Sequence, residues 1–162
     1  MSPADQRCFL AAQGWLELGD WKSAEHELEE LTPAHRAMPE VLELRWLIHA
    51  KGNRWNDAVE VARALVRIAP SKSDSFVNLA FALHELKRTA EARDILLPVA
   101  AQFPKVWTIP YNLACYAAQL GELSEARDWL AQAFRLGNAK ELKVQATDDP
   151  DLAPLWADSE SI

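Results

Sequence analysis

Four histidines and two cysteines are the residues of this chain that most often ligate metals or act as nucleophiles. The histidines His26, His35, His49 and His84 show no pairing at metal-ligand spacing, and the sequence contains no HExxH motif. Cys115 has no histidine at a spacing that suggests a base, so a buried or idle thiol is favoured over a nucleophile. The sequence therefore predicts no enzyme activity, no metal site and no cofactor.

Other features that could do chemistry have simpler interpretations. No glycine-rich phosphate loop occurs, and the acidic run over residues 25–30 is typical of a solvated helix face. Seven tryptophans could stack on nucleic-acid bases, but Trp15, Trp21 and Trp55 fall at helix starts or seams and are expected in the core. The net charge of −7 argues against non-specific binding of nucleic acid or anionic membranes.

Composition places the chain among globular proteins. With 162 residues, 49% of them hydrophobic, it fits one domain with a sizeable core. No apolar stretch approaches the roughly 20 residues of a membrane span, and the first residues lack the features of a signal peptide. Two cysteines far apart in the sequence favour a reducing compartment, so the expected location is cytoplasmic.

A repeating pattern organises the elements that must position these side chains. Its clearest copy, residues 107–140, has two amphipathic halves broken at Gly121. Shifting by the length of this copy aligns Ala126 with Ala92 and then with Ala58. A fixed period of this size indicates a solenoid of helix pairs. The predicted fold is all-α and right-handed, with about four helix pairs, nine or ten helices and no sheet; the expected repeats are 5–38, 39–72, 73–106 and 107–140.

The end of the chain leaves the period. Residues 138–146 are expected to form one more helix, with Leu142 and Val144 turned inward, which completes a solenoid over residues 1–146. Residues 147–162 then form a capping tail whose last residues, from Ala157, are loose. The tail side chains expected to dock are Leu152, Leu155 and Trp156. Earlier in the chain, Pro98 is expected to kink its helix or end it near residue 97.

The 34-residue period, with Leu113, Ala114, Gly121 and Ala126 in order, resembles the tetratricopeptide repeat family over nearly the whole chain. Longer strings are similar to small bacterial members of the kinesin light chain type, which accompany bacterial tubulins. These strings are residues 42–46, 81–89, 107–116 and 148–156. The resemblance implies a scaffold that binds proteins.

The resemblance also implies that the first helix of each pair lines a concave groove that receives a peptide or a helix. Asn78 and Asn112, one repeat apart, suit contacts with a partner backbone, and the neighbouring apolar side chains suit anchoring. The alternative is that these residues pack against neighbours or the C-terminal tail. The predicted groove residues are Phe9, Gln13, Leu16, Glu43, Leu44, Leu47, Val77, Asn78, Phe81, His84, Tyr111, Asn112, Cys115 and Gln119.

The sequence departs from the family pattern at several positions, which limits the partners that the groove is expected to bind. Trp46 stands where the repeat usually has a small residue, and Thr89 where it often has an aromatic one. Family members that hold chaperone C-termini use a clamp of Lys, Asn and Arg. The corresponding positions here are Phe9, Gln13, Leu44, Asp74 and Asn78. Because none of these is a cation, binding of a free C-terminal carboxylate is not expected.

The function predicted from the sequence is therefore a non-catalytic adaptor or scaffold, monomeric, that binds a protein partner. The partner surface is a peptide, a helix or a filament, and the narrower resemblance implies a bacterial tubulin. The alternative is a chaperone that shelters an apolar segment of a secreted or assembling client. The sequence leaves open whether the concave groove or the acidic outer face carries the contact.

Overall fold

The computed structural model describes residues 1–157 of the chain, and this part contains only helices, turns and irregular segments. The expectation of an all-α chain without a sheet is confirmed for these residues. In chain order the helices are α1 (Pro3–Glu17), α2 (Trp21–Glu29), α3 (Pro33–Arg36), α4 (Pro39–Lys51), α5 (Trp55–Ile68), α6 (Ser73–Glu85), α7 (Thr89–Gln102), α8 (Thr108–Gln119), α9 (Leu123–Leu136), α10 (Ala139–Asp148), the 3₁₀ helix η1 (Pro150–Leu152) and α11 (Ala153–Ala157). The expected nine or ten helices are too few, because the short helices α3 and α11 form where only loops were expected.

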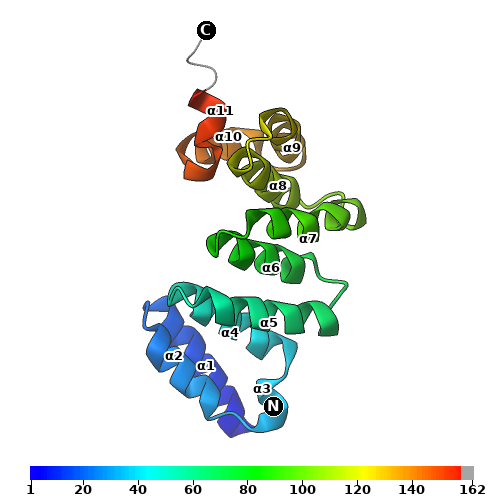
Figure 1. The fold of residues 1–162 in the computed structure, drawn as a ribbon. Coiled ribbons are helices and arrows are strands. Elements are labelled where there is room, and N and C mark those ends of the chain that lie inside the picture. The colour runs from blue at the N-terminus through cyan, green and yellow to red at the C-terminus, as the bar shows by residue number, and fades with distance from the viewer. Residues whose placement is uncertain (158–162) are drawn as a thin grey trace. The chain divides into compact units, whose positions relative to one another are not determined.

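The chain divides into two compact units, Met1–Ala82 and Leu83–Ile162, with the boundary inside α6. In the first unit α1 packs against α2 and α4 against α5. In the second unit α8 packs against α9 and also contacts α7 and η1. Figure 1 shows α1 beside α2, α4 beside α5 and α8 beside α9. Within residues 1–157, no helix combines the length and apolar character needed to cross a membrane.

A residue with positive φ closes the turn inside each helix pair. These residues are Gly19 and Gly121, both at 82°, Asn53 at 55° and Lys87 at 63°. They stand one repeat length apart along the chain. Glycine adopts this conformation without steric penalty, whereas another L-residue loses roughly 1–2 kcal/mol there. The recurrence means that each first helix reverses into its partner through the same backbone geometry.

Fully buried alanines recur at one position on the second helix of each pair. Ala24, Ala58, Ala92 and Ala126 lie on α2, α5, α7 and α9, again one repeat length apart, and each is 0% exposed. A methyl side chain lets two helix backbones approach closely, and the larger residues around it fill the remaining space. The alignment of Ala58, Ala92 and Ala126 in the sequence thus corresponds to equivalent buried positions in the structure.

Asp5 ties the start of α1 to the start of α3 in the first unit. Its carboxylate is buried and accepts hydrogen bonds from the Thr32 backbone N–H at 2.9 Å and from the Ser2 hydroxyl at 2.8 Å. His35 Nδ1 lies 2.7 Å from the same carboxylate. The Thr32 N–H, followed by the Ser2 hydroxyl, lowers the pKa of Asp5 from 3.8 to about 2.

We expect the Asp5 carboxylate to give the protein an acid-dependent part of its stability. Because folding lowers the pKa of Asp5, its contribution is fully present above about pH 4 and is lost as the pH falls towards about 2. The melting temperature of the Asp5→Asn variant should therefore lie below that of the wild type at pH 6, and the gap should close on acidification. Thermal melts between pH 2 and pH 6 measure this gap. A gap that stays constant would show that the charge of Asp5 is not what stabilises the fold.

Pro98 does not end its helix, and the expected early end near residue 97 is wrong. Helix α7 continues to Gln102, and two residues near the proline, Leu96 and Val99, are buried. Their burial offsets the backbone bond that proline cannot donate. The carbonyl left without this bond belongs to Asp94, which is exposed and so lies near water.

Two further expectations about burial and one about the tail are corrected. Val144 is 63% exposed, because Leu142 and Ala146, four residues apart, already define the buried face of α10. Trp15 is 40% exposed, since α1 fully buries only Asp5 and Ala12 and its inward face is too narrow to include the indole. In the tail, Ala157 is helical rather than loose, and the rest of that expectation concerns residues 158–162, outside the described residues.

Candidate functional site

The groove residues predicted for the first unit lie on α1, α4 and α6. Leu44 is an exception to the prediction: it is only 6% exposed and belongs to the hydrophobic core of this unit, so its assignment to an open groove is wrong. The remaining residues are half-buried or exposed, which leaves their side chains accessible. They are Phe9, Gln13, Leu16, Glu43, Leu47, Val77, Asn78 and Phe81.

One repeat position changes from open to covered along the chain. Gln13, Leu47, Phe81 and Cys115 occupy equivalent positions in successive repeats, each on the first helix of its pair. Gln13 is exposed, Leu47 is 49% exposed and Phe81 is 38% exposed, whereas Cys115 is only 4% exposed. The first three positions thus offer open surface, two of them apolar, and the fourth is covered.

Phe81 rests on a cluster of aromatic rings in the first unit. Its ring centroid lies 5.7 Å from that of Trp55 and 6.3 Å from that of Trp46, and the two indoles are 6.4 Å apart. Trp46 is 6% exposed. Trp46, which stands where the repeat usually has a small residue, therefore packs against Phe81. An exposed aromatic side chain on a rigid aromatic base is the kind of residue that anchors a binding partner.

In the second unit, the C-terminal tail covers the corresponding surface. The Tyr111 hydroxyl donates to Asp149 Oδ2 at 2.9 Å, and the Cys115 thiol lies 3.8 Å from the same oxygen. The Gln119 amide donates to the backbone carbonyl of Asp151 at 2.8 Å. Asp149 also caps η1 by accepting from the Asp151 N–H at 3.0 Å. The segment of Asp149 and Asp151 is thus held by side chains of α8.

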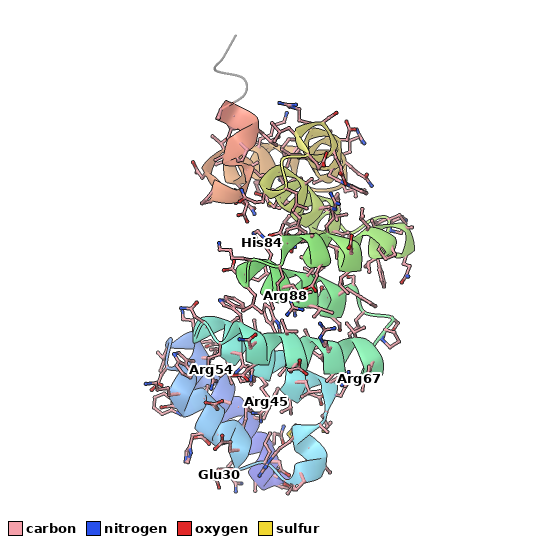
Figure 2. The ribbon with its side chains drawn as sticks, viewed as in Figure 1. Glu30, Arg45, Arg54, Arg67, His84 and Arg88 are labelled. Atoms are coloured by element: carbon pink, nitrogen blue, oxygen red, sulfur yellow. The ribbon has the colours of Figure 1, made fainter. Side chains whose placement is uncertain are left out.

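His84 holds the same segment from the end of α6, where Figure 2 labels it. Its Nε2 lies 3.0 Å from Asp151 Oδ2, and its Nδ1 lies 2.9 Å from the Thr89 hydroxyl. The second departure from the repeat pattern, Thr89, therefore orients the imidazole. An aromatic residue at position 89 could not make this hydrogen bond.

Burial and nearby carboxylates make the Cys115 thiol hard to ionise. Burial is the largest cause that raises its pKa, followed by the charges of Asp149 and Asp151. Burial likewise raises the pKa of Tyr111, with the hydrogen bond to Asp149 as the next cause. At neutral pH the free side chain of Cys115 is therefore a thiol, which is a poor nucleophile.

The structure thus separates the predicted groove residues into two sets. His84, Tyr111, Cys115 and Gln119 gather around the tail, which is the packing alternative raised by the sequence. Asn112 is half-buried on the same helix as Tyr111. The residues of the first unit other than Leu44 stay accessible. A role in partner binding for either set stays a prediction.

Sequence reasoning foresaw a docked tail but missed the two aspartates that fasten it. Leu152 and Leu155 are buried as expected, and the expected docking of Trp156 is partial, since its indole donates to the Ala146 carbonyl at 3.2 Å while 36% of it is exposed. One sequence signal could have revealed these contacts. The tail carries two carboxylates, Asp149 and Asp151, and the expected groove face carries two possible hydrogen-bond donors, Tyr111 and Cys115.

Comparison with known proteins places the fold. No protein-family model matches the sequence, and no curated protein does so either. Among solved structures, the chain is similar to TTC0263, a thermophilic TPR protein in Thermus thermophilus, with a TM-score of 0.75 and 21% identity over 96% of this chain and 83% of that one. It is also similar to residues 41 to the end of MamA from Desulfovibrio magneticus RS-1, with a TM-score of 0.74 and 18% identity over 99% of this chain and 96% of that one.

Proposed function

Because the chain has the tetratricopeptide-repeat fold, we propose that it is a non-catalytic adaptor that binds a protein partner. The main support is a difference in exposure at one repeat position. Leu47 and Phe81 occupy this position in the first unit, and Cys115 occupies it in the second. At Cys115 the chain's own tail covers this position, whereas Leu47 and Phe81 remain exposed. A partner segment that covers Leu47 and Phe81 would use the same face of a first helix as the tail does.

The proposed contact has an apolar centre and polar edges. Phe81 supplies an aromatic anchor with Trp55 and Trp46 beneath it, and Leu47 adds aliphatic surface on α4. Asn78, half-buried on the helix of Phe81, offers amide groups to a partner backbone. This composition suits an extended or helical protein segment with apolar side chains.

We expect Phe81→Ala to weaken partner binding about tenfold, or roughly 1.4 kcal/mol, because truncation removes the anchoring ring. The partner is first captured from a native extract with the wild-type chain and identified, and its affinity is then measured by calorimetric titration. Leu18→Ala is the control, since Leu18 is 79% exposed and lies outside the proposed contact. Equal affinities for the Phe81 variant and the wild type, with unchanged helical content, would remove this face from consideration.

Charge reversal distinguishes the apolar face from the acidic outer one. Glu29 and Glu30 lie exposed at the end of α2, where Figure 2 labels Glu30. If the Phe81 face carries the contact, replacing both acids by lysine should alter association mainly at low salt, because exposed charges are screened. Loss of binding at every salt concentration, with Phe81→Ala silent, would place the partner on the acidic face.

The finer form of the proposal is a cytoplasmic, monomeric accessory protein of a bacterial tubulin filament. Its support is the resemblance of residues 42–46, 81–89, 107–116 and 148–156 to bacterial kinesin light chains. Capture of filament subunits supports this form. Capture of one unfolded client instead supports the chaperone alternative, in which Phe81 and Leu47 shelter an apolar segment.

A further inference from the structure

We propose that Cys115, Asp149 and Asp151 form a binding site for a divalent transition-metal ion of the zinc class. One ligand atom from each residue lies within 4.8 Å of the other two, and Cys115 Sγ is 3.8 Å from Asp149 Oδ2. With bonds of about 2.3 Å to sulfur and about 2.0 Å to oxygen, tetrahedral zinc places its ligand atoms roughly 3.3–3.5 Å apart. Small side-chain rotations therefore bring all three atoms into one coordination shell.

The charges of the cluster favour a cation. Two carboxylates of the tail meet a thiol that is only 4% exposed. Within residues 1–157, neither carboxylate is paired with Lys or Arg, and the basic side chain within hydrogen-bond distance is His84. Two negatively charged carboxylates held against a buried helix face are unfavourable unless a positive charge compensates them. A divalent ion supplies that charge.

A second observation comes from Tyr116, whose side chain is 1% exposed. Among the described residues its hydroxyl has no hydrogen-bond partner, which is rare for a buried polar group and calls for an unseen water or ion. Tyr116 directly follows Cys115 on α8, and its ring centroid lies 5.0 Å from that of His84, the residue that contacts Asp151.

Positioning residues already orient both carboxylates. His84 Nε2 lies 3.0 Å from Asp151 Oδ2, and Thr89 fixes the other ring nitrogen. The Tyr111 hydroxyl donates to Asp149 Oδ2. Metal sites rely on residues that hydrogen-bond to the ligands, and removing such a residue typically lowers the metal affinity about 10-fold to 100-fold. The cluster thus has ligands and supporting hydrogen bonds on both sides.

The ligand set selects the ion. Carboxylates alone would suit magnesium or calcium, but a thiolate sulfur favours zinc, and cobalt(II) reports on the same geometry. Binding replaces the thiol proton: the S–H bond of Cys115 breaks, a sulfur–metal bond forms and one proton enters the solvent. The bound ion would cross-link α8 to η1 and so fasten the tail.

The test uses the full chain after treatment with a chelator, titrated with Zn²⁺ by calorimetry and with Co²⁺ by absorbance. We expect one ion per chain and a thiolate-to-cobalt charge-transfer band. Cys115→Ser should abolish the band and weaken Zn²⁺ at least about tenfold, and His84→Gln should weaken it about tenfold while keeping the band. Cys8→Ser, which changes the other cysteine, should behave as the wild type.

Asp151→Asn guards against a folding defect, because the side chain of Asp151 is 36% exposed and tolerates a neutral isostere. This variant should keep the wild-type helical content in chelator, yet lose the rise in melting temperature that Zn²⁺ gives the wild type. Absence of stoichiometric Zn²⁺ binding, or binding and a cobalt band that survive in Cys115→Ser, overturns the proposal. Neither result bears on the partner contact at Phe81, which the capture experiment tests separately.

Discussion

Replacing Ala126 by Trp is expected to lower the free energy of unfolding by about 3 kcal/mol or more. Ala126 is 0% exposed on α9, the helix that packs against α8 in the second unit. An indole cannot fit where a methyl group fills the seam, so either α8 and α9 separate or the side chain adopts a strained rotamer. Chemical denaturation followed by circular dichroism measures the loss.

Ala131→Trp is the matched control for this substitution. It makes the same chemical change on the same helix, but Ala131 is exposed, and the expected change is within about 0.5 kcal/mol. If the two variants unfold at the same denaturant concentration, the alanine seams do not determine the packing of the helix pairs. The repeat register would then need another physical basis.

Leu152→Ala is expected to destabilise the second unit by about 3 kcal/mol. Leu152 is 0% exposed, and its helix η1 packs against α8. Shortening the isobutyl side chain to a methyl group leaves a cavity under the tail, which adds to the lost transfer free energy. Hydrogen exchange read along the sequence should show reduced protection in α8 and in the tail helices.

Leu120→Ala provides the control in the same unit, because Leu120 is 37% exposed at the end of α8 and should contribute less than about 1 kcal/mol. The Leu152 experiment also distinguishes two roles for the tail. A large loss of stability marks it as part of the fold, which any partner must leave in place. A negligible loss would mark it as a displaceable segment, and the surface of Tyr111 and Cys115 would become available to a partner.

The repeated part of the fold was predictable because its signals are local and recur. The period placed Ala58, Ala92 and Ala126 in the seams, and Gly121 at a turn, without reference to any distant residue. Each of these positions depends on helix geometry alone: a small residue where backbones approach, and a positive φ where the chain reverses. The periodicity of the sequence was therefore sufficient to predict the helix pairs and their register.

The candidate site was less predictable because its decisive contacts join residues far apart in sequence. His84 meets Asp151 across 67 positions, and Cys115 meets Asp149 across 34. Periodicity placed Tyr111 and Cys115 on one helix face but carried no information about the segment that covers it. The same limitation applies to Ile68, whose helical spacing from Ala58, Ala62 and Leu65 predicts burial but which is 49% exposed at the last residue of α5.

The four turns with positive φ bear on how such a chain can grow or shrink in evolution. Gly19, Asn53, Lys87 and Gly121 reach the same backbone region with three different side chains, so the turn does not depend on one residue type. Unequal recombination that adds or removes whole repeat lengths leaves every such turn intact, whichever copies are exchanged. Changes of any other length would move residues such as Ala92 and Leu96 off the buried face of their helix. Length variation among descendants of this chain is therefore expected to be quantised in whole repeats.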